Sequence, residues 1–371
     1  MSAFFSQLID YGRTRMDLFR SFRLKLFMAK LLRVKRILTG TLDEVKVNPI
    51  LIPSSRKGSK LKLGLIDHSF HSRTVSSTFF INLLKDRVHL EIFPDSIWNG
   101  GRAIDPDFLN GKHLDALILW QVFYYYKPSM LKKIHCNRIF LVPMADDAHS
   151  VPDHYLKKYV NCSIISFSRY FHERFINLGM DSKYYQYAVD HQSLPSLQSD
   201  FSDLHGFFWQ RTNDITWKDI RKLIEGSDFK SFHLHVALDP IWYKAVVPTE
   251  EEMKRYHITM TGWFDKREDY LQALSQANVF FAPRLYEGIG MPFLEAMAMG
   301  MLVVAPDHPT MNEYINHGVN GLLYDIHAPG PLDFSRAGEM GGHAREYMSR
   351  YYTNWNKSKQ DLAEWICTIP K

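Results

Sequence analysis

Short apolar runs alternate with helical stretches along the chain from about residue 60 onward. A continuous apolar run of about four to eight residues is typical of a strand that is buried on both faces of a sheet. The expected strands are Leu61–Ile66, Val88–Phe93, Ala116–Trp120, Ile139–Val142, Ile164–Phe167, Gly206–Trp209, His233–Leu238, Ile258–Thr261, Val279–Ala282 and Met301–Ala305. The expected helices are Val75–Leu84, Tyr155–Val160, His172–Leu178, Trp217–Ile224, Tyr270–Ala277 and Pro292–Ala298. Strands that alternate with helices predict parallel sheets covered by helices on both faces.

This alternation occurs twice, on either side of a polar segment. The stretch HQSLPSLQSDFSDL at 191–204 is rich in serine and contains a proline, as expected of an interdomain linker. We therefore expect one doubly wound, Rossmann-like α/β domain at 60–190, a second one at 205–342, and a helical segment at 343–371. Ligands of such sheets bind beyond the carboxyl ends of the strands, so a cleft between two facing domains is the expected site.

The composition is that of a globular protein. The chain has 371 residues, of which 46% are hydrophobic and 23% are charged, so it can bury sizeable cores and intrinsic disorder is excluded. No stretch approaches the roughly 20 apolar residues that a membrane-spanning helix needs, which excludes a polytopic membrane protein. Three widely spaced cysteines exclude a disulfide framework and a cysteine-only zinc site. Together these features predict a reduced, cytoplasmic protein.

The basic charge is concentrated in the N-terminal segment, residues 1–59. Residues 1–40 contain nine Lys or Arg and two Asp, a net charge of +7 within a chain whose total is +5. A nucleic-acid-binding fold would spread this charge, so no nucleic-acid partner is expected. Apolar residues at helical spacing predict a basic amphipathic helix within 15–38: Met16, Phe19, Phe22, Leu24, Phe27, Leu31 and Leu32. Two interpretations stay open: peripheral contact with the inner face of the plasma membrane, or a helix packed on the body with a solvated basic face.

Two common nucleotide-binding fingerprints are absent. The segments that follow the first strand of each half, 66–73 and 209–214, contain no G-x-G-x-x-G. The chain also lacks a GxxxxGK[ST] motif. Both absences argue against an NAD-dependent enzyme and a P-loop NTPase.

The strongest chemical signal is the segment FFAPRLYEGIGMPFLEAMAMGMLVVAP at 280–306. An apolar strand runs into a loop with Glu287, and a helix with a proline in its first turn follows. Gly288 and Gly290 let the backbone approach a ligand closely, and the helix N-terminus favours a phosphate. Glu295, in the first turns of that helix, can accept hydrogen bonds from ribose hydroxyls. The pattern fits a nucleoside diphosphate that carries a sugar, and also a strand–loop–helix connection with two solvated glutamates.

The segment 283–325 resembles the C-terminal signature of the retaining GT-B glycosyltransferases of the family 4 group. That family carries Glu-x7-Glu within P-S-x-x-E-G-x-G-x-x-x-x-E-A-M-A-x-G, followed by a strand, P-E and N-G-x-L. The residues that fall on this frame are Glu287, Gly288, Gly290, Glu295, Ala296, Gly300, Glu313, Asn320 and Gly321. The chain departs from the frame at Arg284, where a small hydroxyl residue is usual, and in the spacing of Pro309 and Glu313. The resemblance extends weakly over about residues 60–350.

The resemblance implies roles for residues of the second half. Glu287 would contact the donor sugar and help to stabilise the transition state, and Glu295 would hold the ribose. The residues whose backbone amides would bind the diphosphate are Gly288, Ile289, Gly290 and Met291. Arg211 and, more loosely, Lys218 would offset the charge of the diphosphate. Trp263 would stack on the nucleobase, although an aromatic residue near a strand end is often part of the core.

In the first half, the resemblance places an acidic residue or a histidine against the transferred sugar. Asp146 is the first choice and His149 the second; the alternative is that they cap a helix that begins near Pro152. His68, His71 and Arg73 are candidates for acceptor binding. The last helix, at 343–371, would cross back towards the first domain.

The implied function is transfer of a sugar, with retention, from a UDP- or GDP-linked donor to a glycan or lipid-linked acceptor, as in bacterial surface polysaccharide synthesis. No metal and no cofactor are expected. Asp105-Pro-Asp107 has the spelling of the metal-binding motif of GT-A enzymes, but it lies in a polar loop. The alternatives are a sugar-nucleotide epimerase or hydrolase on the same fold, and a non-catalytic binding module. Both signature glutamates are present, which argues against the last.

Overall fold

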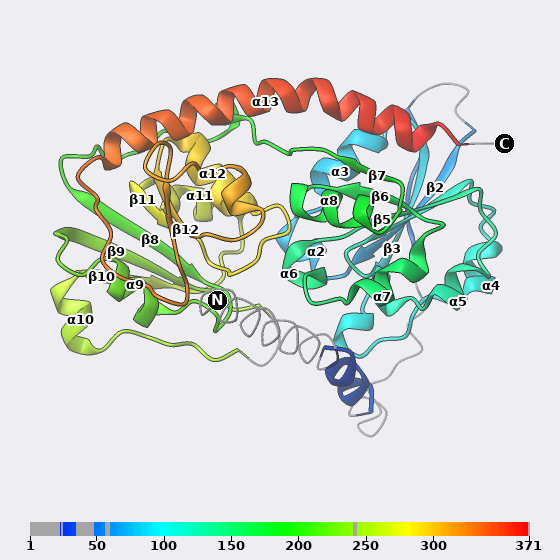
Figure 1. Cartoon of the computed structure of the whole chain (residues 1–371), viewed down its shortest axis with the longest axis horizontal. Coiled ribbons are helices and arrows are strands. Elements are labelled where there is room, and N and C mark those ends of the chain that lie inside the picture. The colour runs from blue at the N-terminus through cyan, green and yellow to red at the C-terminus, as the bar shows by residue number, and fades with distance from the viewer. Residues whose placement is uncertain (1–22, 24, 35–47, 56–59, 240–242, 370–371) are drawn as a thin grey trace, which may run out of the picture. The chain divides into compact units, whose positions relative to one another are not determined.

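The computed structural model describes residues 23, 25–34, 48–55, 60–239 and 243–369. The chain divides into two compact units, each with its own sheet (Figure 1). Unit 1 comprises Met1–Tyr185 and Ser358–Lys371, and unit 2 comprises Gln186–Lys357. The expected α/β class with two Rossmann-like sheets is confirmed.

The sheet of unit 1 has seven strands in the order β1-β3-β2-β4-β5-β6-β7. The strands are β1 (Ile50–Ile52), β2 (Lys62–His68), β3 (His89–Asp95), β4 (Ala116–Trp120), β5 (Arg138–Val142), β6 (Ser163–Ser166) and β7 (Ser182–Tyr184). All neighbours are parallel except β1, which pairs antiparallel with β3 at the edge. The chain reverses its direction of winding between β2 and β4, which makes their carboxyl ends the switch point of this sheet.

Short helices join the strands of unit 1. They are α2 (His71–Thr74), α3 (Thr78–Leu84), α4 (Pro106–Asn110), α5 (Pro128–Leu131), α6 (Ala145–Ala148), α7 (Asp153–Leu156) and α8 (Arg169–Asn177), with 3-10 turns at η1 (Ile97–Asn99), η2 (Phe123–Tyr125) and η3 (Lys157–Tyr159). The helix expected at Val75–Leu84 begins only at Thr78. Val75 ends α2 with a left-handed φ of 51°, so the two helices cannot be continuous.

The sheet of unit 2 has six parallel strands in the order β10-β9-β8-β11-β12-β13. The strands are β8 (Leu204–Gln210), β9 (Phe229–Val236), β10 (Ile258–Thr261), β11 (Val279–Phe281), β12 (Leu302–Pro306) and β13 (Leu322–Tyr324). The winding direction reverses between β8 and β11, because β9 and β10 lie on one side of β8 and β11 to β13 on the other. The carboxyl ends of β8 and β11 are therefore the expected ligand site of this sheet.

Helices of unit 2 pack against that sheet through aromatic and aliphatic residues. They are α9 (Trp217–Leu223), α10 (Glu250–Arg255), α11 (Arg267–Ser275) and α12 (Met291–Met299), with 3-10 turns at η4 (His191–Ser193) and η5 (Met311–Glu313). Trp217 of α9 is 1% exposed and stacks edge-on against Phe232 of β9, with ring centroids 5.0 Å apart. Such burial of large side chains fixes the strands whose ends form the site.

The last helix, α13 (Ala337–Cys367), carries the chain out of unit 2 and into unit 1, whose final part begins at Ser358 (Figure 1). Within unit 1, Tyr185 donates a hydrogen bond of 2.6 Å to Asp361. Among the described residues no helix is both long and apolar enough to cross a membrane.

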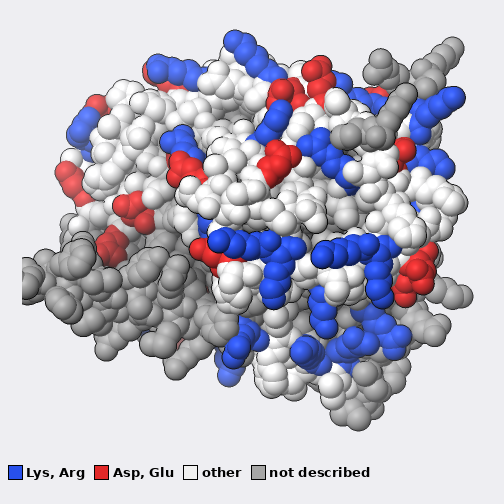
Figure 2. All heavy atoms as spheres, turned by 45° about the vertical axis from the view of Figure 1, so that its right-hand side comes forward, with Lys and Arg blue, Asp and Glu red and all other residues white. Residues whose placement is uncertain are grey.

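Near the N-terminus a helix covers residues 25–34. Most of the apolar positions expected in 15–38 lie outside the described residues. The helix backbone packs on the turn after η1, since a Cβ at Gly100 would meet that of Leu32 at 2.8 Å. Phe27, Leu31 and Val34, at spacings of four and three, are 45–56% exposed on its outer face. Figure 2 shows Lys and Arg gathered on one face of the molecule.

Candidate functional site

The N-terminus of α12 points its first backbone amides into the loop at the carboxyl end of β11. Gly290 is the N-cap residue, with a left-handed φ of 76°, and a Cβ there would lie 2.0 Å from the ring of Phe293. Only glycine fits this position. No side chain caps the helix, and Pro292 occupies its first turn. A buried helix start without a side-chain cap leaves amides and the positive end of the helix dipole for an anion.

Glu287 lies in the loop before α12 and is 3% exposed. Its carbonyl oxygen accepts a hydrogen bond of 2.7 Å from the hydroxyl of Thr310. Thr310 is fully buried and has a left-handed φ of 79°, an unfavourable backbone conformation for a β-branched residue. The loop that carries Glu287 is thus anchored by Thr310, whose backbone is strained. Backbone strain of this kind is common beside functional groups.

Glu295 lies on the second turn of α12 and is also 3% exposed. Arg267, the first residue of α11, pairs with its carboxylate and keeps 43% of its own side chain exposed. Burial raises the pKa of Glu295, and the Arg267 guanidinium opposes this rise. Arg267 covers the carboxylate without sealing it, so a hydroxyl-bearing ligand could share or replace this pair.

At the switch point of the unit 2 sheet, two arginines share one aspartate. Arg211 follows β8 and binds Asp239, which follows β9, with two nitrogens at 2.8 and 3.2 Å from Oδ1. Arg284 follows β11 and pairs with the other oxygen of Asp239. Burial would raise the pKa of Asp239, but the two guanidinium groups outweigh it and hold the pKa below its usual value.

Tyr270, on the first turn of α11, lies between the charged groups of unit 2. Its pKa is raised well above the usual value by burial, then by Glu295 and Glu287, while Arg267 and Arg211 lower it. The Tyr270 phenol is therefore within electrostatic reach of all four side chains. The Tyr270 hydroxyl is buried and has no hydrogen-bond partner among the described residues.

An aromatic chain extends from Tyr270 to the end of β8. The ring centroids of Tyr270 and Trp209 are 5.3 Å apart, and those of Trp209 and Trp263 are 5.7 Å apart. The Arg211 guanidinium lies over Trp209 at 4.7 Å. The structure therefore brings the predicted Trp263 and Arg211 together on Trp209, at the end of β8. Lys218 is the second residue of α9, and its side chain is exposed.

The predicted site residues of unit 1 lie on α6, just beyond β5. His149 is the C-cap of this short helix, and its ring Nδ1 lies 2.7 Å from the Ala145 carbonyl oxygen. Asp146 is half-buried. The carbonyl oxygens of Asp146 and Asp147 accept hydrogen bonds from Lys25 at 3.3 and 3.0 Å. Neither predicted residue caps α7, because its N-cap is Pro152 and it has no side-chain cap.

Asp147, between the two predicted residues, accepts a hydrogen bond from the Tyr124 hydroxyl. Burial raises the pKa of Asp147, while Lys25 and Tyr124 lower it. Asp95 at the end of β3 has a similar setting: Tyr126 donates to its carboxylate, and burial raises its pKa to about 6. The carboxyl edge of unit 1 therefore holds two acids that accept hydrogen bonds from phenols, and one of them, Asp147, also pairs with Lys25.

The switch point of unit 1 is bridged by a histidine. Nδ1 of His71 lies 2.6 Å from Asp67, which ends β2, and its Nε2 lies 3.1 Å from Oε1 of Gln121, which follows β4. Ser77 donates to the second oxygen of Asp67 at 2.6 Å. Gln121 has a left-handed φ of 68°. This network of histidine, aspartate, glutamine and serine side chains offers both donors and acceptors to a hydroxyl group.

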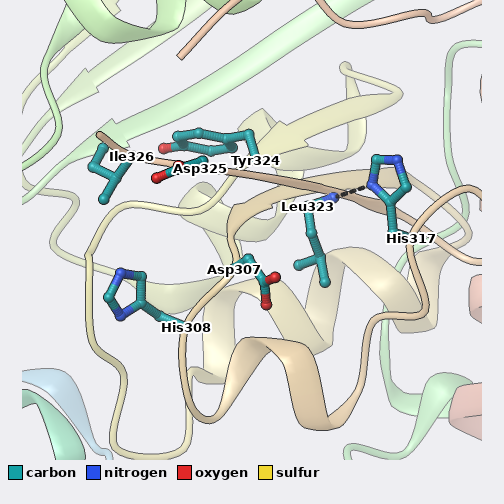
Figure 3. A pocket seen from close by; sticks show the side chains of 7 residues that line it. All are labelled: Asp307, His308, His317, Leu323, Tyr324, Asp325 and Ile326. Carbon is teal, nitrogen blue, oxygen red and sulfur yellow. Dashed lines mark hydrogen bonds between the residues drawn. The ribbon is translucent and has the colours of Figure 1, made fainter. Parts of the chain in front are cut away.

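A separate cavity of about 360 Å³ opens at the carboxyl ends of β12 and β13 (Figure 3). Figure 3 shows its lining: Asp307, His308, His317, Leu323, Tyr324, Asp325 and Ile326. The ring of His308 stacks edge-on against Tyr286, with centroids 4.9 Å apart. Because Tyr286 precedes Glu287, the cavity adjoins the loop before α12.

Sequence reasoning missed the partners of the predicted residues. Arg267, Asp239 and Tyr270 gave no motif, because their contacts join strand ends and helix starts 28 positions or more apart. In the sequence, Arg284 differs from the family frame, but nothing there indicates its partner Asp239. Asp105 of the Asp-x-Asp pair is the N-cap of α4 and accepts from the amide of Asp107 at 2.8 Å. Among the described residues no group of three His, Cys, Asp or Glu is placed to hold a metal ion.

Comparisons with known proteins agree with this geometry. Residues 213–335, which include both signature glutamates, match the family described as Glycosyl transferases group 1. No curated protein sequence matches the chain.

Among solved structures, sucrose-phosphate synthase from Thermosynechococcus elongatus has a TM-score of 0.63 at 12% identity, over 83% of this chain and 98% of that one. The lipopolysaccharide outer core galactosyltransferase WaaB has a TM-score of 0.57 at 15% identity, over 83% and 100% of the two chains. HepE of Anabaena, in complex with UDP and glucose, has a TM-score of 0.55 at 15% identity, over 82% and 100%. The chain has the GT-B fold of these glycosyltransferases, and its residues 213–335 are similar to the group 1 family.

Proposed function

We propose that the chain is a retaining, metal-independent glycosyltransferase of the family 4 group, which moves a sugar to a glycan or lipid-linked acceptor. One observation carries the proposal: two buried glutamates flank the uncapped N-terminus of α12. A nucleoside diphosphate sugar gives a task to each group, because it offers hydroxyls at both ends and negative charge in the middle.

Unit 2 would bind the donor. The amides at Gly288–Met291 and the dipole of α12 bind the diphosphate. Glu295 accepts hydrogen bonds from the ribose hydroxyls, which replace part of its ion pair with Arg267. Trp263 stacks on the base. UDP is the first nucleotide to test, since HepE is described in complex with UDP and with UDP-glucose.

Bond cleavage leaves negative charge on the diphosphate and positive charge on the sugar. The helix N-terminus and Arg211 stabilise the first charge, and the Glu287 carboxylate stabilises the second. Because these groups are fixed before the reaction, they require little reorganisation as charge develops. The acceptor hydroxyl attacks from the side that the leaving group vacates and passes its proton to an oxygen of the departing diphosphate, which gives retention. No step requires a metal.

Unit 1 would bind the acceptor. Asp146 and His149 stand at the carboxyl end of β5, where a sugar hydroxyl could meet them, and His71 with Asp67 offers a second polar position. A role in the synthesis of a bacterial surface polysaccharide fits a glycan or lipid-linked acceptor.

The helix at 25–34 would contact the inner face of the plasma membrane. Phe27, Leu31 and Val34 form an exposed apolar stripe, and Lys30 and Arg33 beside it are exposed too. Such a helix binds anionic lipid by burying its apolar face among the headgroups. Flotation with phosphatidylglycerol vesicles tests this: Phe27→Ser with Leu31→Ser should lose binding. Equal flotation of the variant and the wild type would refute membrane contact through this helix.

Donor binding is tested by thermal unfolding with UDP, GDP, CDP and ADP and their sugar conjugates, with EDTA present. A saturable rise of several degrees with one nucleotide is expected. A rise only when a metal replaces EDTA would contradict metal independence.

The reaction is tested by NMR of the product formed from the selected donor. The proposal requires a new glycosidic bond with the anomeric configuration of the donor. An inverted product would contradict retention. Release of free sugar in the presence of acceptors would indicate a hydrolase, and an altered sugar nucleotide would indicate an epimerase.

A further inference from the structure

The helix at 25–34 has an inner face as well as the exposed apolar stripe. Lys25, Ala29 and Leu32 stand at spacings of four and three, which places them on one side of the helix. Ala29 is buried, and Lys25 and Leu32 are half-buried. Phe27, two positions from Lys25, lies about 200° around the helix and is exposed. The helix therefore has one face towards the body of unit 1 and the opposite face towards solvent.

Lys25 contacts α6 from this inner face. Its Nζ donates hydrogen bonds to the carbonyl oxygens of Asp146 at 3.3 Å and Asp147 at 3.0 Å, and it lies 3.5 Å from Oδ1 of Asp147. The last four carbonyl groups of a helix have no partner within it, and α6 has only 4 residues. A lysine there supplies donors, and its charge meets the negative end of the helix dipole. Lys25 thus caps α6 from 121 and 122 positions away in the sequence.

The amine of Lys25 is withdrawn from solvent to make this contact. The Lys25 side chain is 29% exposed, whereas Lys30 and Arg33 on the same helix are exposed. Asp147, with which it pairs, is 18% exposed and also accepts from Tyr124. An amine that leaves water needs acceptors in return, and the carbonyl and carboxylate oxygens at α6 provide them. The contact therefore fixes α6 to the helix at 25–34.

We propose that Lys25 is a positioning residue for the acceptor side of unit 1, and that it links lipid contact by the outer face of its helix to the placement of Asp146 and His149. This inference rests on the proposed function. Lys25 can cap α6 only while its helix lies on the body of unit 1. A lipid surface that binds the helix in this docked state favours that state, and it therefore orders α6 as well.

Hydrogen–deuterium exchange of the full chain at 145–151 tests the positioning role. Lys25→Met should speed exchange there about tenfold, the loss expected for a hydrogen bond from a charged group, and Lys25→Arg should restore it. Lys30→Met is the matched control, because it removes the same charge from an exposed position of the same helix. Faster exchange in neither variant, or equally in both, would overturn the positioning role. If Lys25→Met does not fold, Lys25→Gln supplies the same comparison.

Phosphatidylglycerol vesicles test the link to lipid. At vesicle concentrations that float every protein compared, exchange at 145–151 should slow in the wild type and in Lys30→Met, but not in Lys25→Met. Unchanged exchange in the vesicle-bound wild type would overturn the link. If the wild type does not float but Lys25→Met still speeds exchange, the positioning role stands and the membrane proposal fails.

The transfer reaction separates this inference from the proposed function. Lys25→Met should slow transfer from the selected donor about tenfold, Lys25→Arg should recover it, and UDP affinity should stay within about twofold of the wild type, because unit 2 binds the donor. An equal loss of UDP affinity would mean that Lys25 supports the fold as a whole, and it would overturn the inference. If the wild type transfers no sugar, the proposed function fails, while the exchange results still decide whether Lys25 holds α6.

Discussion

The two sheets end in chemically different edges, although both are doubly wound. At the switch point of unit 2, arginines pair with carboxylates: Arg211 and Arg284 with Asp239, and close by Arg267 with Glu295. At the carboxyl edge of unit 1, most of these contacts are with histidine, serine or tyrosine side chains: Asp67 pairs with His71 and Ser77, Asp95 with Tyr126, and Asp147 with Tyr124 and also with Lys25.

This difference teaches how one architecture serves two kinds of ligand. Fixed arginines beside an uncapped helix suit a diphosphate, whose charge is present in every state of the reaction. A set of buried acids and hydroxyls suits an acceptor hydroxyl, which is neutral until it reacts.

The largest effect is expected at Glu287. Glu287→Ala should lower the transfer rate about 10²- to 10³-fold, because it removes a fixed charge that faces the developing positive sugar. Nucleotide affinity should stay close to that of the wild type. Initial rates and a calorimetric titration on the same preparation measure both. A variant that transfers normally but binds nucleotide poorly would exchange the roles of Glu287 and Glu295.

The buried acid Asp95, at the carboxyl edge of unit 1, should make the stability of the fold depend on pH. The pKa of Asp95 in the folded chain is about 6 against an ordinary 3.8, so the fold favours the neutral acid. Stability from this group is therefore full at low pH and is lost as the pH rises through about 4 to 6, by up to about 3 kcal/mol. Asp95→Asn should remove this loss. Urea unfolding at pH 4.5 and 7.5 checks it, and an unchanged pH dependence would count against the buried-acid account.

Glu295→Ala should weaken nucleotide binding about ten- to a hundredfold, since it removes the acceptor for the ribose hydroxyls. Titration with UDP and with a deoxyribose analogue measures the effect. The loss should be smaller for the analogue, which lacks one hydroxyl. Equal losses for both ligands would mean that Glu295 supports the pocket through Arg267 alone.

The smallest effect is expected at Tyr270, and its two parts have opposite signs. Tyr270→Phe should stabilise the ligand-free chain by about 1 kcal/mol, because it removes a buried hydroxyl without a partner. The same change should weaken the binding of UDP about three- to tenfold, because the variant lacks the hydroxyl that would hydrogen-bond to the ligand. Thermal unfolding with and without UDP measures both parts. A less stable ligand-free variant would show that the hydroxyl is satisfied inside the fold.

The sequence predicted the strands and the α12 region well, for a physical reason. Buried strands such as Ala116–Trp120 are continuous apolar runs. The start of α12 requires a glycine at position 290 for steric reasons, and that glycine is visible in the sequence. The sequence did not predict the helix break at Val75 or the edge strand β1, because a positive φ and an antiparallel edge strand leave no periodic pattern in the sequence.

The ion pairs of the site could not be read from the sequence. Arg267 and Glu295 stand 28 positions apart, and Arg284 and Asp239 stand 45 apart, so their contacts depend on strand order. The family resemblance indicates Lys218 as a diphosphate-binding residue. The structure leaves the side chain of Lys218 exposed on α9. Residue types near strand ends are thus predictable, but their partners require the topology.

The most direct test of the contrast is hydrogen–deuterium exchange with and without UDP, in the presence of EDTA. The account predicts slower exchange at 284–296 and around Arg211, both in unit 2, and little change at 143–150 in unit 1. Protection confined to 143–150, or none at saturating UDP, would contradict the claim that the cationic edge of unit 2 binds the donor.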